Sequence, residues 1–128
     1  MKRLTTALVL ATVALTGVTL AGCTTTSGSA PTSDVQVTSD TVIVDVRTPA
    51  EYASGHLDGA VNIDWEGADF MTTLDGLDKN GAYVLYCHSG RRAGEALAMM
   101  QSMGFTNVTN LGGIDQAAAT TGIAVVTS

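Results

Sequence analysis

The stretch CHSGRR, from Cys87 to Arg92, brings a thiol, an imidazole, a glycine and two guanidinium groups together within six residues. A cysteine reacts as its thiolate, and a helix N-terminus or a nearby cation stabilises that form. Gly90 permits a sharp turn, and the planar fork of an arginine suits an oxyanion. The stretch therefore predicts a nucleophilic Cys87 in an anion-binding loop. The alternative interpretation is an inert cysteine that ends a buried strand.

The segments around this stretch predict a strand that enters it and a helix that leaves it. Residues 82–87, AYVLYC, are continuously apolar, which is typical of a strand buried on both faces. In residues 91–104 apolar side chains recur at helical spacing, and Gly104 ends the pattern. Further strands are predicted at 41–46 and 106–111, a terminal edge strand at 123–128, and further helices at 48–55 and 66–77.

The order of these segments predicts a small α/β domain with a central, mainly parallel sheet flanked by helices. Ligands of such sheets bind outside the carboxyl ends of the strands, where Cys87 lies. The turn into the following helix would aim several backbone N–H groups at one point, with the positive end of the helix dipole behind them. The first helix has a strong start signal, because Thr48 can cap it, Pro49 follows and Glu51 completes a capping box.

The charge balance argues against nucleic acid or an anionic lipid surface as a partner. The chain has 128 residues and a formal charge of -6, and all 12 acidic residues follow residue 33. Of the 6 Lys and Arg residues, two stand at positions 2 and 3, and two of the remaining four are Arg91 and Arg92. We expect no metal, because the adjacent Cys87 and His88 chelate poorly and only His56 adds a nitrogen ligand. No phosphate-loop or dinucleotide pattern occurs, and we expect no cofactor.

The N-terminus predicts a targeting segment. Lys2 and Arg3 precede a mainly apolar run, and LAGC, Leu20 to Cys23, resembles a bacterial lipobox in which Cys23 takes the lipid. A plain secretory signal or a short membrane anchor is the alternative. We therefore expect a signal peptide at 1–22, the lipidated Cys23 with a flexible tether over 23–33, and one domain at 34–128. The protein would be exported and lipid-anchored to a bacterial membrane, at the cell surface or in the periplasm. Cys87 would then have no disulfide partner within the chain.

Three motifs resemble those of the rhodanese-type sulfurtransferases. DVRTPAEYASGHLDGAVNI, residues 45–63, is similar to their N-terminal signature, and CHSGRR is similar to their six-residue active-site loop. FTNVTNLGGI, residues 105–114, resembles their late strand and Gly-Gly turn. The layout is most similar to single-domain, exported rhodaneses of the phage-shock type.

The resemblance implies a small rhodanese-like domain, expected to be monomeric, that transfers sulfur. Cys87 would take the outer sulfur of thiosulfate or another sulfane-sulfur donor and pass it, as a persulfide, to cyanide, a small thiol or a protein thiol. The backbone from His88 to Arg92, including Ser89 and Gly90, would bind the anionic persulfide, and Arg91 or Arg92 would hold the sulfonate end of the donor. Whether His88 acts in the chemistry or only faces solvent stays open.

Four polar residues of the first motif are interpreted as scaffold and not as chemistry. Arg47 and Glu51 are spaced for an ion pair across the turn into the helix, and Asp45 and His56 can fix neighbouring loops by hydrogen bonds. The acidic side chains of Asp64, Glu66 and Asp69 are interpreted as a solvated face.

Two other functions compete with sulfur transfer. A cysteine-dependent phosphatase or arsenate reductase would need five residues between Cys and Arg to enclose a tetrahedral oxyanion, whereas four residues separate Cys87 from Arg92. A non-enzymatic sulfur or redox carrier would use the same nucleophile to hand persulfide to one partner.

Overall fold

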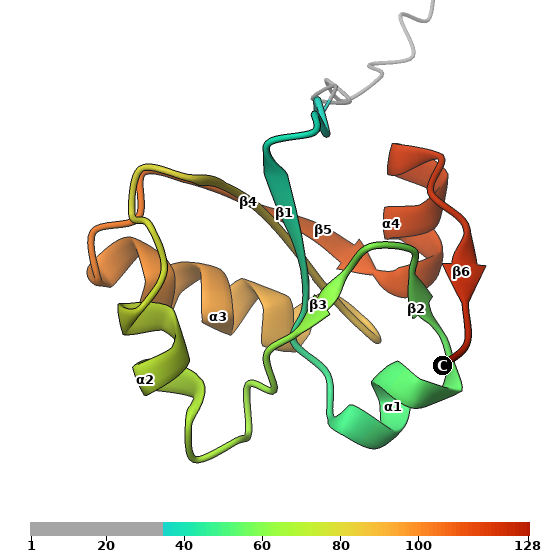
Figure 1. The fold of residues 1–128 in the computed structure, drawn as a ribbon, viewed down its shortest axis with the longest axis horizontal. Coiled ribbons are helices and arrows are strands. Elements are labelled where there is room, and N and C mark those ends of the chain that lie inside the picture. The colour runs from blue at the N-terminus through green and yellow to red at the C-terminus, as the bar shows by residue number, and fades with distance from the viewer. Residues whose placement is uncertain (1–34) are drawn as a thin grey trace, which may run out of the picture. The chain divides into compact units, whose positions relative to one another are not determined.

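The computed structural model describes residues 35–128, and four parallel strands form its central sheet. Along the chain the elements are β1 Thr41–Asp45, α1 Pro49–Ser54, β2 His56–Leu57, β3 Val61–Asn62, α2 Phe70–Asp75, β4 Ala82–Cys87, α3 Arg91–Ser102, β5 Asn107–Gly113, α4 Ile114–Thr121 and β6 Val125–Val126. The sheet order is β3-β1-β4-β5, so β1 and β4 lie in the middle (Figure 1). The predicted α/β architecture, with a mainly parallel sheet flanked by helices, is confirmed.

The two central strands are buried on both faces from Ile43 onward in β1 and from Tyr83 onward in β4, as their apolar sequences predict. Side chains alternate between faces along a strand, so Tyr83, Leu85 and Cys87 contribute to one core cluster. Val84 and Tyr86 contribute to a second cluster on the opposite face. Cys87 is therefore the last side chain of a fully covered strand, and the core fixes the direction in which its sulfur points.

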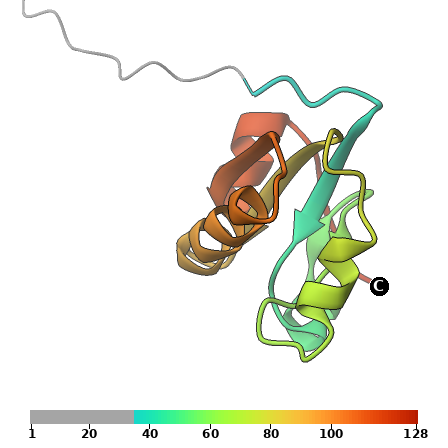
Figure 2. The same cartoon turned by 90° about the vertical axis from the view of Figure 1, so that its left-hand side faces the viewer.

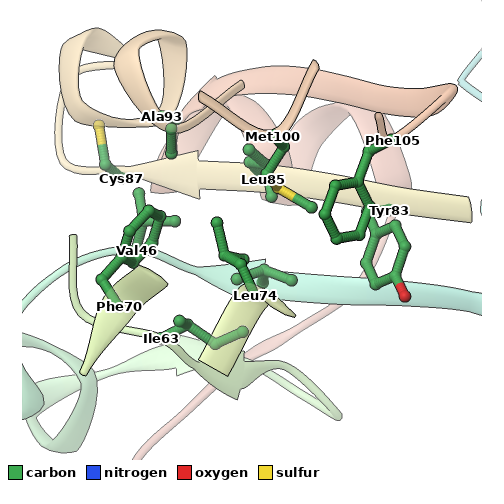
Figure 3. Packing of buried hydrophobic residues seen from close by; sticks show 12 residues of the cluster. Val46, Ile63, Phe70, Leu74, Tyr83, Leu85, Cys87, Ala93, Met100 and Phe105 are labelled. Carbon is green, nitrogen blue, oxygen red and sulfur yellow. The ribbon is translucent and has the colours of Figure 1, made fainter. Parts of the chain in front are cut away.

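Helices α2 and α3 cover the first face of the sheet, and α4 covers the second face together with β2 (Figure 2). On this face Phe70 and Leu74 of α2 and Ala93 and Met100 of α3 belong to the same buried cluster as Leu85 and Cys87 (Figure 3). The longest helix, α3, packs along β4 and β5. This packing sets the start of α3 directly beyond the end of β4.

Two predicted elements differ from those observed. The helix expected over 66–77 is confined to α2, because Asp64 holds the preceding residues in a turn: its side chain accepts a hydrogen bond from the N–H of Glu66 at 3.0 Å and its carbonyl one from Gly67 at 3.0 Å. The terminal edge strand is reduced to β6, which pairs antiparallel with β2 in a separate two-stranded sheet. It therefore does not extend the central sheet.

Candidate functional site

Cys87 lies at the carboxyl end of β4, and its thiol is completely covered, with 0% of the residue exposed. Gly90 turns the chain with φ of +91° and is the N-cap residue of α3. The N–H of Gly90 donates a hydrogen bond to Cys87 Sγ at 2.9 Å. Figure 3 shows the sulfur directed toward the turn that leads into α3. The predicted strand, turn and helix thus meet at the sulfur.

The turn from β5 into α4 supports this loop from behind. A Cβ atom on Gly113 would lie 2.5 Å from the carbonyl oxygen of His88, and one on Gly90 would lie 3.1 Å from Gly112 Cα. Only glycines permit these two backbones to approach so closely. The Gly-Gly pair noted in the sequence is therefore part of the site, because it lets the loop pack against β5.

Asn110 supports the loop from β5, a contact that the sequence interpretation missed. Its Nδ2 donates to the carbonyl of Gly90 at 3.0 Å, and its Oδ1 accepts from the N–H of Gly112 at 2.8 Å. The same Gly90 carbonyl accepts the first helical bond of α3, from Gly94 at 2.9 Å. A polar amide in a partly buried strand, two residues before a glycine pair, is the signal that could have found it.

These bonds orient the peptide between Gly90 and Arg91. In a trans peptide the N–H points opposite to the C=O. The Gly90 carbonyl points along the axis of α3, so the Arg91 N–H of the same peptide points out of the N-terminal end of the helix. The first N–H groups of a helix have no partner inside the helix and attract negative charge. Together with the Gly90 N–H at the sulfur, they can stabilise an anion formed on Cys87.

The other predicted site residues, His88 and Ser89, have exposed side chains, and neither side chain makes a hydrogen bond within residues 35–128. Their contribution to the site is through the backbone, since the His88 carbonyl packs against Gly113. An exposed His88 is accessible to a molecule that approaches the loop from solvent.

The two loop arginines lie in different environments. Arg92 forms a bidentate pair with Glu51, with both Nη–Oε distances at 2.8 Å, and its Nη1 lies 3.7 Å from Glu66 Oε2. Arg91 is exposed and bonds Glu95 one helical turn onward at 2.9 Å. Glu66, interpreted from sequence as part of a solvated face, therefore lies beside the site.

The predicted ion pair between Arg47 and Glu51 is wrong. Arg47 turns back to Asp45, with Nε 2.9 Å from Oδ1, and also donates to the Gly55 carbonyl at 2.6 Å. Glu51 does form the predicted capping box with Thr48, and its carboxylate also binds the guanidinium of Arg92 at the start of α3. The interpretation of Asp45 and Arg47 as scaffold agrees with their burial.

His56 is also held within the scaffold. Its Nδ1 lies 2.9 Å from the Tyr52 carbonyl, and its ring stacks on that of Tyr52 with centroids 3.7 Å apart. The ring is buried beside β6 and lies outside the Cys87 loop.

Two surface hollows lie away from the sulfur. One, of about 420 Å³, is at the amino ends of β1, β4 and β5, where Thr41, Ala82 and Asn107 line it. The other, of about 300 Å³, is beside β3 and the start of α2, where Asn62 and Phe70 line it. Neither includes Cys87, because the loop and the turn after β5 cover the thiol.

The hydrogen bonds from Arg92, and then those from Thr48, lower the pKa of Glu51 from 4.5 to about 2. The same pair raises the pKa of Arg92. Because the pKa of Glu51 is lower in the folded protein than in the unfolded chain, the ionised carboxylate stabilises the fold. This stabilisation is fully present at pH values above the unfolded-state pKa of 4.5, and it is lost as the pH falls through about 2.

We expect Glu51→Gln to lower the free energy of unfolding by about 1 kcal/mol near neutral pH, a modest amount because a third of this side chain is exposed. The difference between the variant and the parent should be constant above pH about 5 and shrink toward pH about 2. Urea unfolding followed by circular dichroism at several pH values measures it. A difference that grew on acidification would contradict this assignment.

Comparison with known proteins identifies close relatives. The family model of the rhodanese-like domain matches residues 32–120, which include the whole loop from Cys87 to Arg92. The thiosulfate sulfurtransferase PspE of Escherichia coli K12 is 37% identical over 71 residues, covering 56% of this chain and 68% of that protein. The thiosulfate sulfurtransferase GlpE of Pseudomonas entomophila is 37% identical over 73 residues, covering 56% and 64%. A solved rhodanese with anions from E. coli matches with a TM-score of 0.59 at 32% identity, over 69% of this chain and 99% of that one.

Proposed function

This chain belongs to the family of rhodanese-like domains and is a sulfurtransferase, and we propose that Cys87 carries the transferred sulfur as a persulfide. The observation that carries the proposal is the position of the Cys87 sulfur at the carboxyl end of β4, where it accepts a hydrogen bond from the Gly90 N–H at 2.9 Å beside the start of α3. This arrangement places a backbone N–H donor and the positive end of the α3 dipole where they can stabilise an anionic persulfide.

The proposed reaction has two steps. The Cys87 thiolate attacks the outer sulfur of thiosulfate, the S–S bond of the donor breaks, and sulfite leaves with the bonding electrons. A thiol or cyanide then attacks the outer sulfur of the persulfide, and the bond to Cys87 breaks to restore the thiolate. Thiosulfate is proposed because the relatives PspE and GlpE are named thiosulfate sulfurtransferases.

The arrangement of the loop supports sulfur transfer over phosphate chemistry. A phosphatase loop encloses a tetrahedral dianion and requires its arginine to be free to bind it. In this chain the loop is short, and Glu51 binds both terminal nitrogens of Arg92. Sulfurtransferase membership also favours an enzyme over the non-enzymatic carrier.

Intact-mass spectrometry tests the proposal. The protein from residue 24 onward keeps every described residue, and incubation with thiosulfate should add the mass of one sulfur atom. Treatment with cyanide should remove it, and peptide mapping should place it on Cys87. Protein alkylated before the incubation is the control and should gain nothing. An unchanged mass in folded, unblocked protein would overturn the proposal.

We propose in addition that Cys23 is lipidated and anchors an exported protein; residues 1–34, which contain the predicted signal peptide, lipid site and tether, lie outside the described residues. Each helix between residues 35 and 128 is too short or too polar to span a bilayer. The proposal is supported by the LAGC motif. Growth with a labelled fatty acid should label the parent protein and not Cys23→Ser. Equal labelling of both would contradict it.

A further inference from the structure

The residues that the structure describes contain four Lys and Arg side chains. Three of them either form a buried or largely buried ion pair or lie far from Cys87. Arg47 is buried against Asp45. Lys79 lies before β4, at the opposite end of the strand from Cys87, and pairs with Asp75 at 3.6 Å. Arg92 is held by Glu51. Arg91 is therefore the one cation of this part of the chain that is both beside the loop and open to solvent, with 71% of its side chain exposed.

Arg92 is poorly suited to receive an anionic donor. Both of its terminal nitrogens bind Glu51, its side chain is only 15% exposed, and Glu66 lies 3.7 Å away. Glu51 cannot easily withdraw, because its carboxylate also accepts from the N–H and the hydroxyl of Thr48. A donor anion placed at Arg92 would meet two carboxylates, and the like charges would repel it.

Arg91 has the opposite properties. Its partner Glu95 is 44% exposed, and a solvent-exposed pair one helical turn apart is weak and is screened by salt. Arg91 is also the first residue of α3, directly after the Gly90 N–H that contacts the sulfur. Its long side chain can leave Glu95 and reach solvent in front of the loop at little cost.

We propose that the two arginines have separate tasks: Arg91 binds the oxyanion end of the sulfur donor, whereas Arg92 is a positioning residue that Glu51 clamps in order to fix the end of the loop. This inference rests on the proposed function and specifies which cation meets the substrate. The raised pKa of Arg92, which its hydrogen bonds to Glu51 cause, agrees with a guanidinium that stays in its pair.

Steady-state kinetics with thiosulfate as the varied substrate separates the two tasks. Arg91→Gln should raise KM by about tenfold with little change in kcat, because it removes a charge-assisted contact to the donor. Arg91→Lys should keep KM within about threefold, because lysine retains the positive charge that attracts the donor anion at this exposed position. Glu95→Gln should lower KM by about twofold, because Arg91 no longer has to leave a partner.

Arg92→Lys should instead lower kcat by about tenfold with KM little changed, because an ammonium group cannot replace the bidentate fork and the loop shifts around the sulfur. Conservative replacement by lysine thus rescues position 91 and does not rescue position 92. Lys79→Gln removes one positive charge at the far end of β4 and should leave both constants unchanged. Circular dichroism shows that each variant is folded.

The possible outcomes distinguish this inference from the function on which it rests. If Arg91→Gln keeps the KM of the parent, or if Arg92→Lys raises KM as much as Arg91→Gln does, the division of tasks is wrong even though the sulfur adduct forms on Cys87. If the parent protein forms no adduct at saturating thiosulfate, the proposed function itself is wrong, and this inference falls with it.

Discussion

Replacing Cys87 with serine should abolish thiosulfate-dependent sulfur transfer and leave the fold intact. A serine hydroxyl ionises far less readily than a thiol and cannot hold sulfane sulfur, so both steps of the reaction are lost. We expect a fall of at least about 10⁴-fold in kcat, the scale seen when a catalytic nucleophile is removed. The rate of thiocyanate formation from thiosulfate and cyanide, with protein from residue 24 onward, measures it.

The structure explains why serine is the appropriate replacement. The side chain at position 87 is completely buried and accepts the Gly90 N–H, and a hydroxyl can accept the same bond. Cys87→Ala would leave the Gly90 N–H without its partner, and the loop could then shift. A loss of activity in that variant could not be assigned to the missing nucleophile alone. Because Cys87 is the only cysteine after residue 23, residual turnover in Cys87→Ser above a tenth of the parent rate would place the nucleophile on another residue.

The sequence predicted those parts of the site that depend on neighbours along the chain. The capping box of α1 needs only Thr48 and the glutamate three residues later, and the turn at Gly90 needs only a flexible residue between a strand and a helix. The continuous apolar run over residues 82–87 likewise placed Cys87 at the end of a buried strand. In each case the physical cause acts over a few residues, so composition and spacing reveal it.

Contacts between distant segments could not be predicted in the same way. Glu51 and Arg92 are 41 residues apart, and Asn110 and Gly90 are 20 apart. Spacing alone favoured Arg47 as the partner of Glu51, because the two are close along the chain. The tertiary fold decides the matter, since it brings the Glu51 carboxylate to Arg92 while Asp45 binds the side chain of Arg47.

Asp45→Ala should lower the free energy of unfolding by about 3–5 kcal/mol, because it leaves the buried guanidinium of Arg47 without its counter-charge. The carboxylate of Asp45 accepts from both the backbone N–H and the Nε of Arg47, each at 2.9 Å, and neither side chain is appreciably exposed. The remaining partners of Arg47 are the Gly55 carbonyl and the face of the Tyr86 ring, 5.6 Å from the guanidinium carbon. These do not replace a negative charge.

Urea unfolding of the parent, of Asp45→Ala and of a double variant distinguishes two quantities. One is the net stability that the Asp45–Arg47 ion pair contributes, and the other is the cost of leaving Arg47 buried without a partner. Asp45→Ala combined with Arg47→Met removes both charges and should be more stable than Asp45→Ala alone, because no unpaired buried charge is left. If the double variant is the less stable, the pair itself contributes the stability and the desolvation argument is wrong.

Because Asp45 and Arg47 hold the scaffold and do not touch the sulfur, Asp45→Ala should keep its kcat per folded molecule, whereas a role in the chemistry would lower kcat even where the variant is fully folded.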